Sequence, residues 1–229
     1  MDVDSRYQPP SAVVSDVVVQ ELPTGPLNPW FSMWTRPRAT IQQIVAADPQ
    51  RLVILLSILI GIIQVLDRAS SRSLGDRLPL SAILATALVA GPISGVIGLY
   101  LYAWVVHATG RALAGTGSRP NIRAALAWGN VPALWASLSW IPALAVLQIE
   151  MFTTETPRIE SSLFHLLMLF GVGVAQFVGG VWSMFAICKA LGQVQGFSAW
   201  KALGNVVLAA LALVLPIGLV VFAIIAASR

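Results

Sequence analysis

The chain has 229 residues and a formal net charge of +4, and 57% of its residues are hydrophobic while only 10% are charged. Soluble domains carry about 25% charged residues, so this composition excludes an ordinary soluble protein. The basic residues are spread along the chain and do not form a cluster. We therefore expect no nucleic-acid partner.

The N-terminal residues 1–27 differ from the rest of the chain. They contain four prolines and no apolar run that repeats with a helical period. A segment that cannot bury apolar surface stays unfolded. We expect a disordered cytoplasmic tail, either a spacer or a partner-binding peptide, followed by a single membrane domain over residues 28–229.

The segment after this tail has the features of a helix that lies along a membrane surface. Trp30 and Trp34 precede an Arg-Pro-Arg sequence, and Ile41 and Ile44 follow at helical spacing. Tryptophan and arginine beside one apolar stripe are typical of a helix in the headgroup region. The pattern predicts an N-terminal interfacial amphipathic helix near residues 36–47.

Long stretches without a charged side chain come next. Four of them exceed the roughly 20 apolar residues of helix that a bilayer core of about 30 Å requires. A fifth is shorter, but it becomes long enough if Asp48 and Pro49 form the N-cap and first turn of its helix. We therefore predict an all-α polytopic membrane protein with five transmembrane helices, at about 48–68, 79–108, 123–148, 162–190 and 201–227.

Arginine and lysine in the connections predict the orientation of the spans. Eight of these residues fall on the side of the predicted interfacial helix, and five fall on the opposite side. Cytoplasmic loops are enriched in arginine and lysine. We therefore expect the N-terminus in the cytoplasm and the C-terminus outside.

The predicted spans contain almost no ionisable side chains, which argues against catalysis within the membrane. Such a group costs about 2.5–3.5 kcal/mol on insertion scales, so it is kept mainly where function needs it. His107 and His165 fall at opposite faces in the predicted topology, and the single cysteine, Cys188, lies in an apolar run. We expect no enzyme activity, no catalytic residue, no metal site and no cofactor.

Neutral amides within the predicted spans are the candidates for a polar cavity. They either form hydrogen bonds between helices or line a pathway for a small solute or lipid. Pro132 frees the carbonyl of Trp128, and a nearby amide such as that of Asn130 could satisfy it. The candidate cavity residues are Asn130, Gln148, Gln176 and Asn205.

Small residues repeat every four positions along the fourth predicted span. Such a stripe lets two helix backbones approach closely, either within the chain or between two copies of it. The candidate packing stripe consists of Gly171, Ala175, Gly179 and Ser183.

The connection 109–123 combines glycines with positive charge. Gly110, Gly115 and Gly117 predict a flexible turn. Its charges act either as a topology signal or as a contact for anionic headgroups, at about 1 kcal/mol for each arginine. The candidate lipid or partner contacts are Arg111, Arg119 and Arg123.

Three segments, taken in order, resemble a known family. Residues 28–38 read NPWFSMWTRPR, residues 110–118 read GRALAGTGS, and residues 124–132 read AALAWGNVP. They are similar to the opening segment, the glycine-rich cytoplasmic turn and the start of span three in bacterial members of the Yip family, named for interaction with Ypt and Rab GTPases. The likeness covers about residues 28–227.

The resemblance implies five membrane helices, a cytoplasmic N-terminus and a bacterial cytoplasmic (inner) membrane. Eukaryotic members act in vesicle traffic, membrane shaping and binding of prenylated Rab GTPases. The chain lacks the Asp-Leu-Tyr-Gly-Pro type motif of those members. We therefore expect a non-enzymatic membrane-organising or adaptor protein that binds anionic lipids, other membrane proteins or a second copy of itself. The alternative is a transporter or channel for a small solute or lipid.

Overall fold

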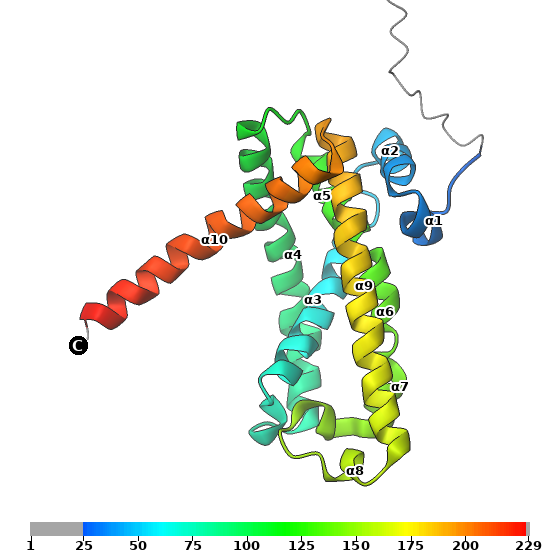
Figure 1. Ribbon diagram of the computed structural model, residues 1–229, viewed down its shortest axis with the longest axis vertical. Helices are drawn as coiled ribbons and strands as arrows, with labels where there is room; N and C mark the ends of the chain where they lie inside the picture. Colours follow the sequence, from blue (N-terminus) through cyan, green and yellow to red (C-terminus); the bar gives the residue numbers. More distant parts are fainter. Residues whose placement is uncertain (1–24, 228–229) are drawn as a thin grey trace, which may run out of the picture.

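The computed structural model describes residues 25–227, and within this range the chain forms helices and no strand (Figure 1). Most of the predicted N-terminal tail lies outside the described residues. The elements are α1 Pro29–Thr35, α2 Pro37–Ala47, α3 Val53–Ser71, η1 Leu74–Asp76, α4 Leu80–Ala112, α5 Arg119–Gly129, α6 Val131–Ser137, α7 Trp140–Leu147, η2 Gln148–Phe152, α8 Pro157–Glu160, α9 Leu163–Gln195 and α10 Ala199–Ala227.

Five helical stretches of the described chain are long and apolar enough to cross a membrane. They are Val53–Ser71, Leu80–Ala112, Arg119–Phe152, Leu163–Gln195 and Ala199–Pro216. The third crosses in pieces, because α5, α6, α7 and η2 follow one another with breaks. The predicted fold class, an all-α protein with five spans and an N-terminal amphipathic helix, is confirmed.

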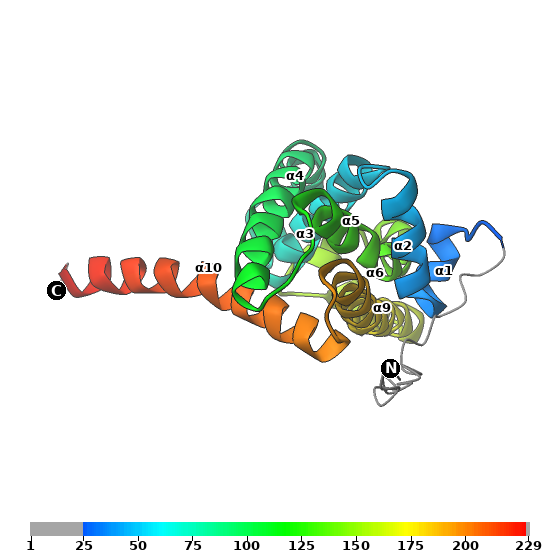
Figure 2. The ribbon, with the colours of Figure 1, turned by 90° about the horizontal axis from the view of Figure 1, so that it is seen from above.

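The apolar stripe of helix α2 packs against other helices of the protein. Ile41 and Ile44 are buried, and the helix packs mainly against α9 and also against α5. In Figures 1 and 2, α1 and α2 lie beside one end of the bundle. The apolar stripe of the predicted interfacial helix therefore docks α2 on the bundle.

The start of the first span differs from the prediction. Asp48 is the C-cap of α2, and its carboxylate accepts a hydrogen bond from the backbone N–H of Gln50. The chain then turns through Leu52, whose φ of 56° is left-handed, and α3 begins at Val53. The aspartate and proline thus close a turn between two helices, a frequent role of both residue types.

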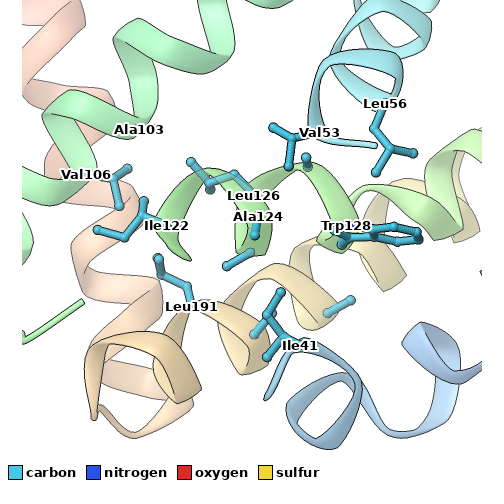
Figure 3. Packing of buried hydrophobic residues seen from close by; sticks show 14 of the residues in the cluster. Ile41, Val53, Leu56, Ala103, Val106, Ile122, Ala124, Leu126, Trp128 and Leu191 are labelled. Carbon is cyan, nitrogen blue, oxygen red and sulfur yellow. The ribbon is translucent and has the colours of Figure 1, made fainter. Parts of the chain in front are cut away.

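The buried side chains form two clusters, one at each end of the bundle. Figure 3 shows the first of them, in which Trp128 and neighbouring α5 side chains meet Val53 and Leu56 of α3, Ile41 of α2 and Leu191 of α9. The second cluster surrounds the ring pair of Trp140 and Phe152, from α7 and η2, whose centroids lie 5.9 Å apart. The described core of the bundle thus consists of two separate groups of side chains.

Helices α3 and α4 make the most extensive contact between elements. A Cβ atom built at Gly61 would collide with the carbonyl oxygen of Gly91 and with the backbone of Gly95. The two backbones therefore touch, which only residues without a side chain permit.

Helix α10 leaves the bundle after its first turns. Asn205 and Ala209 are buried against the bundle, whereas Val214 and Leu215 are exposed. In Figures 1 and 2 the helix runs outward, away from α9 and the α1–α2 pair. The first turns of α10 thus pack against α4 and α9, and the helix leaves them further along.

Candidate functional site

The break between α5 and α6 places a polar residue at the centre of the bundle. Asn130 is the C-cap of α5, and Pro132 is in the first turn of α6. The side-chain amide of Asn130 donates a hydrogen bond of 2.8 Å to the carbonyl of Leu126. It does not bond to Trp128, which the sequence suggests as its partner. The backbone N–H of Asn130 donates to the carbonyl of Ala127 at 3.2 Å, so the carbonyl of Leu126 is left to the side chain.

The backbone freed by this break is satisfied from α9. The N–H of Ala133, near the start of α6, donates a hydrogen bond of 2.8 Å to the hydroxyl of Ser183. The first N–H groups of a helix have no partner within it, and a buried one needs a side-chain acceptor. Ser183 therefore acts in packing within the chain.

Two adjoining cavities lie at the level of this break. Their volumes are about 310 and 320 Å³, and both are lined by Ile60, Gln64 and Asn130. One extends between α3, α4 and α9 to Tyr102, and the other extends between α3, α6 and α9 to Asp67 and Gln176. We call the two together the polar crevice.

The four predicted cavity residues do not share one site. Asn130 and Gln176 lie on the polar crevice. Asn205 is buried between α10 and α4, where it accepts a hydrogen bond of 2.6 Å from Thr109 and donates one of 3.2 Å to the carbonyl of Val106. Gln148 is exposed at the start of η2. Two amides of the set thus line a cavity, one joins two helices, and one lies at the surface.

Gln64 and Asp67 are outside the set of four predicted cavity residues, although Gln64 is one of the neutral amides within the predicted spans. They are three residues apart on α3 and both line the crevice. Residues at this spacing lie on the same helix face. The signal that could have found them is this polar pair near the end of an otherwise apolar helix.

The predicted packing stripe on α9 divides into two parts. Gly179 and Ser183 are buried, and a Cβ atom at Gly179 would meet Ala136 of α6. Gly171 is exposed, and a Cβ atom there would have no neighbour within 4 Å. The stripe is therefore used for contact with α6 along its second half and is open along its first half.

Tryptophan side chains fasten the α1–α2 pair to the spans. The indole N–H of Trp182 donates to the carbonyl of Trp34 at 2.8 Å, and that of Trp135 donates to the carbonyl of Trp30 at 3.2 Å. The rings of Trp30 and Trp128 also meet edge to face, with centroids 5.5 Å apart. Aromatic pairs of this geometry add about 0.5–1.5 kcal/mol to the burial of their surface. The pair is thus held by directional contacts as well as by apolar burial.

The three candidate arginines of the connection after α4 are in different surroundings. Arg111 and Arg119 are exposed. Arg123 is half-buried, with its guanidinium 4.5 Å from the ring centre of Tyr100. Only the first two are therefore free to meet headgroups directly.

The glycines of this connection form a packed turn, although the sequence had predicted a flexible one. Cβ atoms at Gly110 and Gly115 would collide with the buried side chain of Gln195, and the N–H of Thr116 donates to the carbonyl of Gln195 at 3.2 Å. Glycine is needed there because the end of α9 fills the space. The backbone of the turn is thus anchored to the end of α9.

Residues able to bind a metal are not gathered at any point of the described range 25–227, where no group of three such side chains occurs. The histidines lie at different ends of the bundle. Nδ1 of His107 is 3.1 Å from the carbonyl of Gly117, and Nδ1 of His165 is 3.0 Å from the carbonyl of Arg158. Each histidine is thus engaged with a nearby connection.

Comparison with known proteins identifies the family of this chain. No curated protein and no solved structure matches the chain. The family model of the Yip1 domain matches residues 31–222, a range that begins in α1 and ends in α10. The matched range includes all five spans, α2 and α1 from Phe31 onward. The chain is therefore a membrane protein of the Yip1 domain family.

Proposed function

We propose that this protein is a non-enzymatic membrane organiser that gathers anionic lipids at the end of the bundle where α1 and α2 are docked. The observation that carries the proposal is the makeup of this end. Exposed basic side chains surround it on several elements: Arg36, Arg111, Arg119 and Lys201. Positive charge beside a membrane attracts anionic headgroups by about 1 kcal/mol for each residue near the surface.

Exposed aromatic rings support the same placement. Phe31 is 63% exposed and Trp200 is 82% exposed, and both belong to elements at this end. Aromatic rings concentrate at the headgroup level, where one part of the ring meets lipid and another meets water. These rings and the docked α2 would enter one leaflet, with the exposed basic side chains around them at the headgroup level.

The orientation follows from the same charges. We infer that this end faces the cytoplasm, that the chain resides in a bacterial cytoplasmic membrane and that its C-terminus is outside, because basic connections stay inside. Other membrane proteins and a second copy of the chain are further candidate partners. The open first half of the α9 stripe, at Gly171, supports such a contact.

The test replaces Arg111 and Arg119 by alanine together. We expect purified double-variant protein to retain several-fold less phosphatidylglycerol or cardiolipin than the wild type, measured by mass spectrometry of extracted lipid. Labelled phosphatidylglycerol should also cluster less around the variant in reconstituted bilayers. The matched control is Arg72→Ala with Arg158→Ala, which removes two exposed arginines from the opposite end.

Two results would contradict the proposal. One is equal anionic-lipid retention by the test and control variants. The other is inverted insertion of the test variant, since the arginines would then act only as a topology signal.

A further inference from the structure

The polar crevice is a second feature of this molecule, independent of the basic end and of the function proposed for it. It lies at the level of the α5–α6 break, and its apolar lining includes Leu126, Leu134 and Val206 of the first cluster. Polar side chains in membrane spans are costly and are kept where they bind something or contact one another. The contents of the crevice therefore indicate what it binds.

Its wall carries one negative charge and no positive one. Among the described residues that line the two cavities, Asp67 is a carboxylate, and lysine, arginine and histidine do not occur. Asp67 is exposed at the border of the crevice, and a carboxylate attracts a cation more strongly where lipid rather than water surrounds it. The acidic end of the crevice thus selects for a positively charged group.

The amides add a hydrogen-bond donor to this charge. Nε2 of Gln176 is buried and has no hydrogen-bond partner among the described residues. An orphan donor in an apolar region is expensive unless a ligand oxygen meets it. Gln64 and Asn130 line the same cavity, so acceptor and donor groups lie side by side along it.

The crevice is open toward the lipid. Gly180 on α9 lines it and is exposed, and a Cβ atom there would have no neighbour within 4 Å. Its other lining residues include apolar side chains such as Ile63 and Leu134. A ligand can therefore enter sideways from the bilayer while its apolar part remains among lipid chains.

The positions of Asp67 and Gln64 along α3 fit a lipid headgroup that lies near the border of the membrane. Asp67 lies four residues before the end of α3 at Ser71, which is about 6 Å along a helix axis. Gln64 lies one turn deeper. A headgroup with a terminal cation and oxygens closer to its acyl chains matches this order, because its cation meets the carboxylate while its oxygens meet the amides.

We propose that the polar crevice binds, from within the bilayer, the head of a phospholipid that carries a primary amine. The amine lies at Asp67, and the phosphate or ester oxygens lie at Gln176 and its neighbouring amides. Phosphatidylethanolamine has this chemistry, and phosphatidylglycerol lacks the cation.

The experiment uses the full-length protein in detergent with an equal mixture of phosphatidylethanolamine and phosphatidylglycerol of the same chain length. Native mass spectrometry counts the lipids that remain bound. Two independent variants are compared: Asp67→Asn removes the charge and keeps the shape, and Gly180→Leu fills the open side of the crevice. We expect each to reduce bound phosphatidylethanolamine at least fivefold while phosphatidylglycerol is unchanged.

Each variant has a matched control. Glu155→Gln neutralises an exposed carboxylate outside the crevice, and Gly173→Leu places the same side chain on an exposed part of α9 with no neighbour. Equal thermal unfolding of all four variants verifies the fold. The proposal is overturned if the wild type retains no phosphatidylethanolamine, or if the controls lose as much of it as the crevice variants. Failure here leaves anionic-lipid binding at the basic end unaffected, since that depends on Arg111 and Arg119.

Discussion

At the scale of single residues, most polar side chains within the spans satisfy backbone groups at breaks and crossings. Ser183 accepts from the α6 backbone, and Asn205 joins α10 to α4. Tyr102 donates its hydroxyl to the carbonyl of Val206 at 3.0 Å. Among neutral side chains, buried donors without a hydrogen-bond partner among the described residues occur at Trp140, Gln176 and Gln195, and of these three only Gln176 lines the crevice. The combination of an unmatched donor and an adjoining cavity is what marks Gln176 as part of a candidate binding site.

One carboxylate outside the spans gives a prediction on pH. Asp76 accepts hydrogen bonds from the hydroxyl of Thr154 at 2.7 Å and from its N–H at 2.9 Å. These bonds, with a smaller contribution from nearby Arg77, hold the pKa of the Asp76 carboxyl below its ordinary value of 3.8. A lowered pKa stabilises the fold above pH 3.8, and this stability is lost as pH falls through the lower folded value.

We expect Thr154→Val to raise the pKa of Asp76 toward its ordinary value, because the side-chain hydrogen bond is the largest cause of the shift. The measurement is an NMR titration of the carboxyl in detergent. Thr153→Val is the control, since the Thr153 hydroxyl donates to the carbonyl of Glu155 and not to Asp76. An unchanged titration in Thr154→Val would show that another contact sets the pKa.

At the scale of elements, close approach of helices depends on where glycines lie. Gly61, Gly91 and Gly95 let α3 and α4 touch, and Gly179 lets α9 approach α6. Other glycines of the same helices, such as Gly98 and Gly171, have open space around them. The helix contacts of this bundle are thus set by particular glycines, although the residue type is spread along all the spans.

The α9 stripe allows a matched test of this difference. Gly179→Ala should destabilise the protein by about 1–3 kcal/mol, because the new methyl group meets Ala136 and the α6 backbone. Gly171→Ala should be neutral or stabilising by up to about 1 kcal/mol, since alanine favours helix and nothing crowds the site. Unfolding in detergent mixtures measures both. Equal effects would mean that the α6–α9 contact is looser than described.

At the scale of the whole molecule, the two ends of the bundle differ in chemistry. One end carries the docked α1–α2 pair and the anchored turn after α4. The other end holds η1, η2 and α8, where Asp76 is tied to Thr154 and the hydroxyl of Ser70 donates to the carbonyl of Met151. An asymmetry of this kind suits a protein that meets the two leaflets differently.

Accessibility of single cysteines tests which end faces the cytoplasm. Thr116→Cys and Glu155→Cys lie at exposed positions at the two ends, and Cys188 is buried and can be replaced by alanine in both. We expect an impermeant maleimide added outside to label position 155 and to reach position 116 only after permeabilisation. Labelling of both positions from the same side would contradict the five-span topology.

The sequence by itself determined the membrane class, the five spans and the α2 helix. These properties depend on local terms, because the free energy of burying a helix in lipid accumulates residue by residue along it. The order of motifs was also sufficient to indicate the family. The start of α3 was misjudged because Asp48 and Pro49 suit a turn as well as a helix start, and only the geometry of α2 decides between them.

Only the tertiary structure decided which polar residues meet. Asn130 and Gln176 line one crevice with Gln64 and Asp67, whereas Asn205 satisfies the α4 backbone. Which helix faces come together depends on contacts between residues far apart in the chain, such as Gly179 with α6 and Trp182 with α1. Hydropathy is summed along one helix and does not depend on contacts with other helices. An amide within a span therefore contributes the same hydropathy whether it joins two helices or faces a cavity.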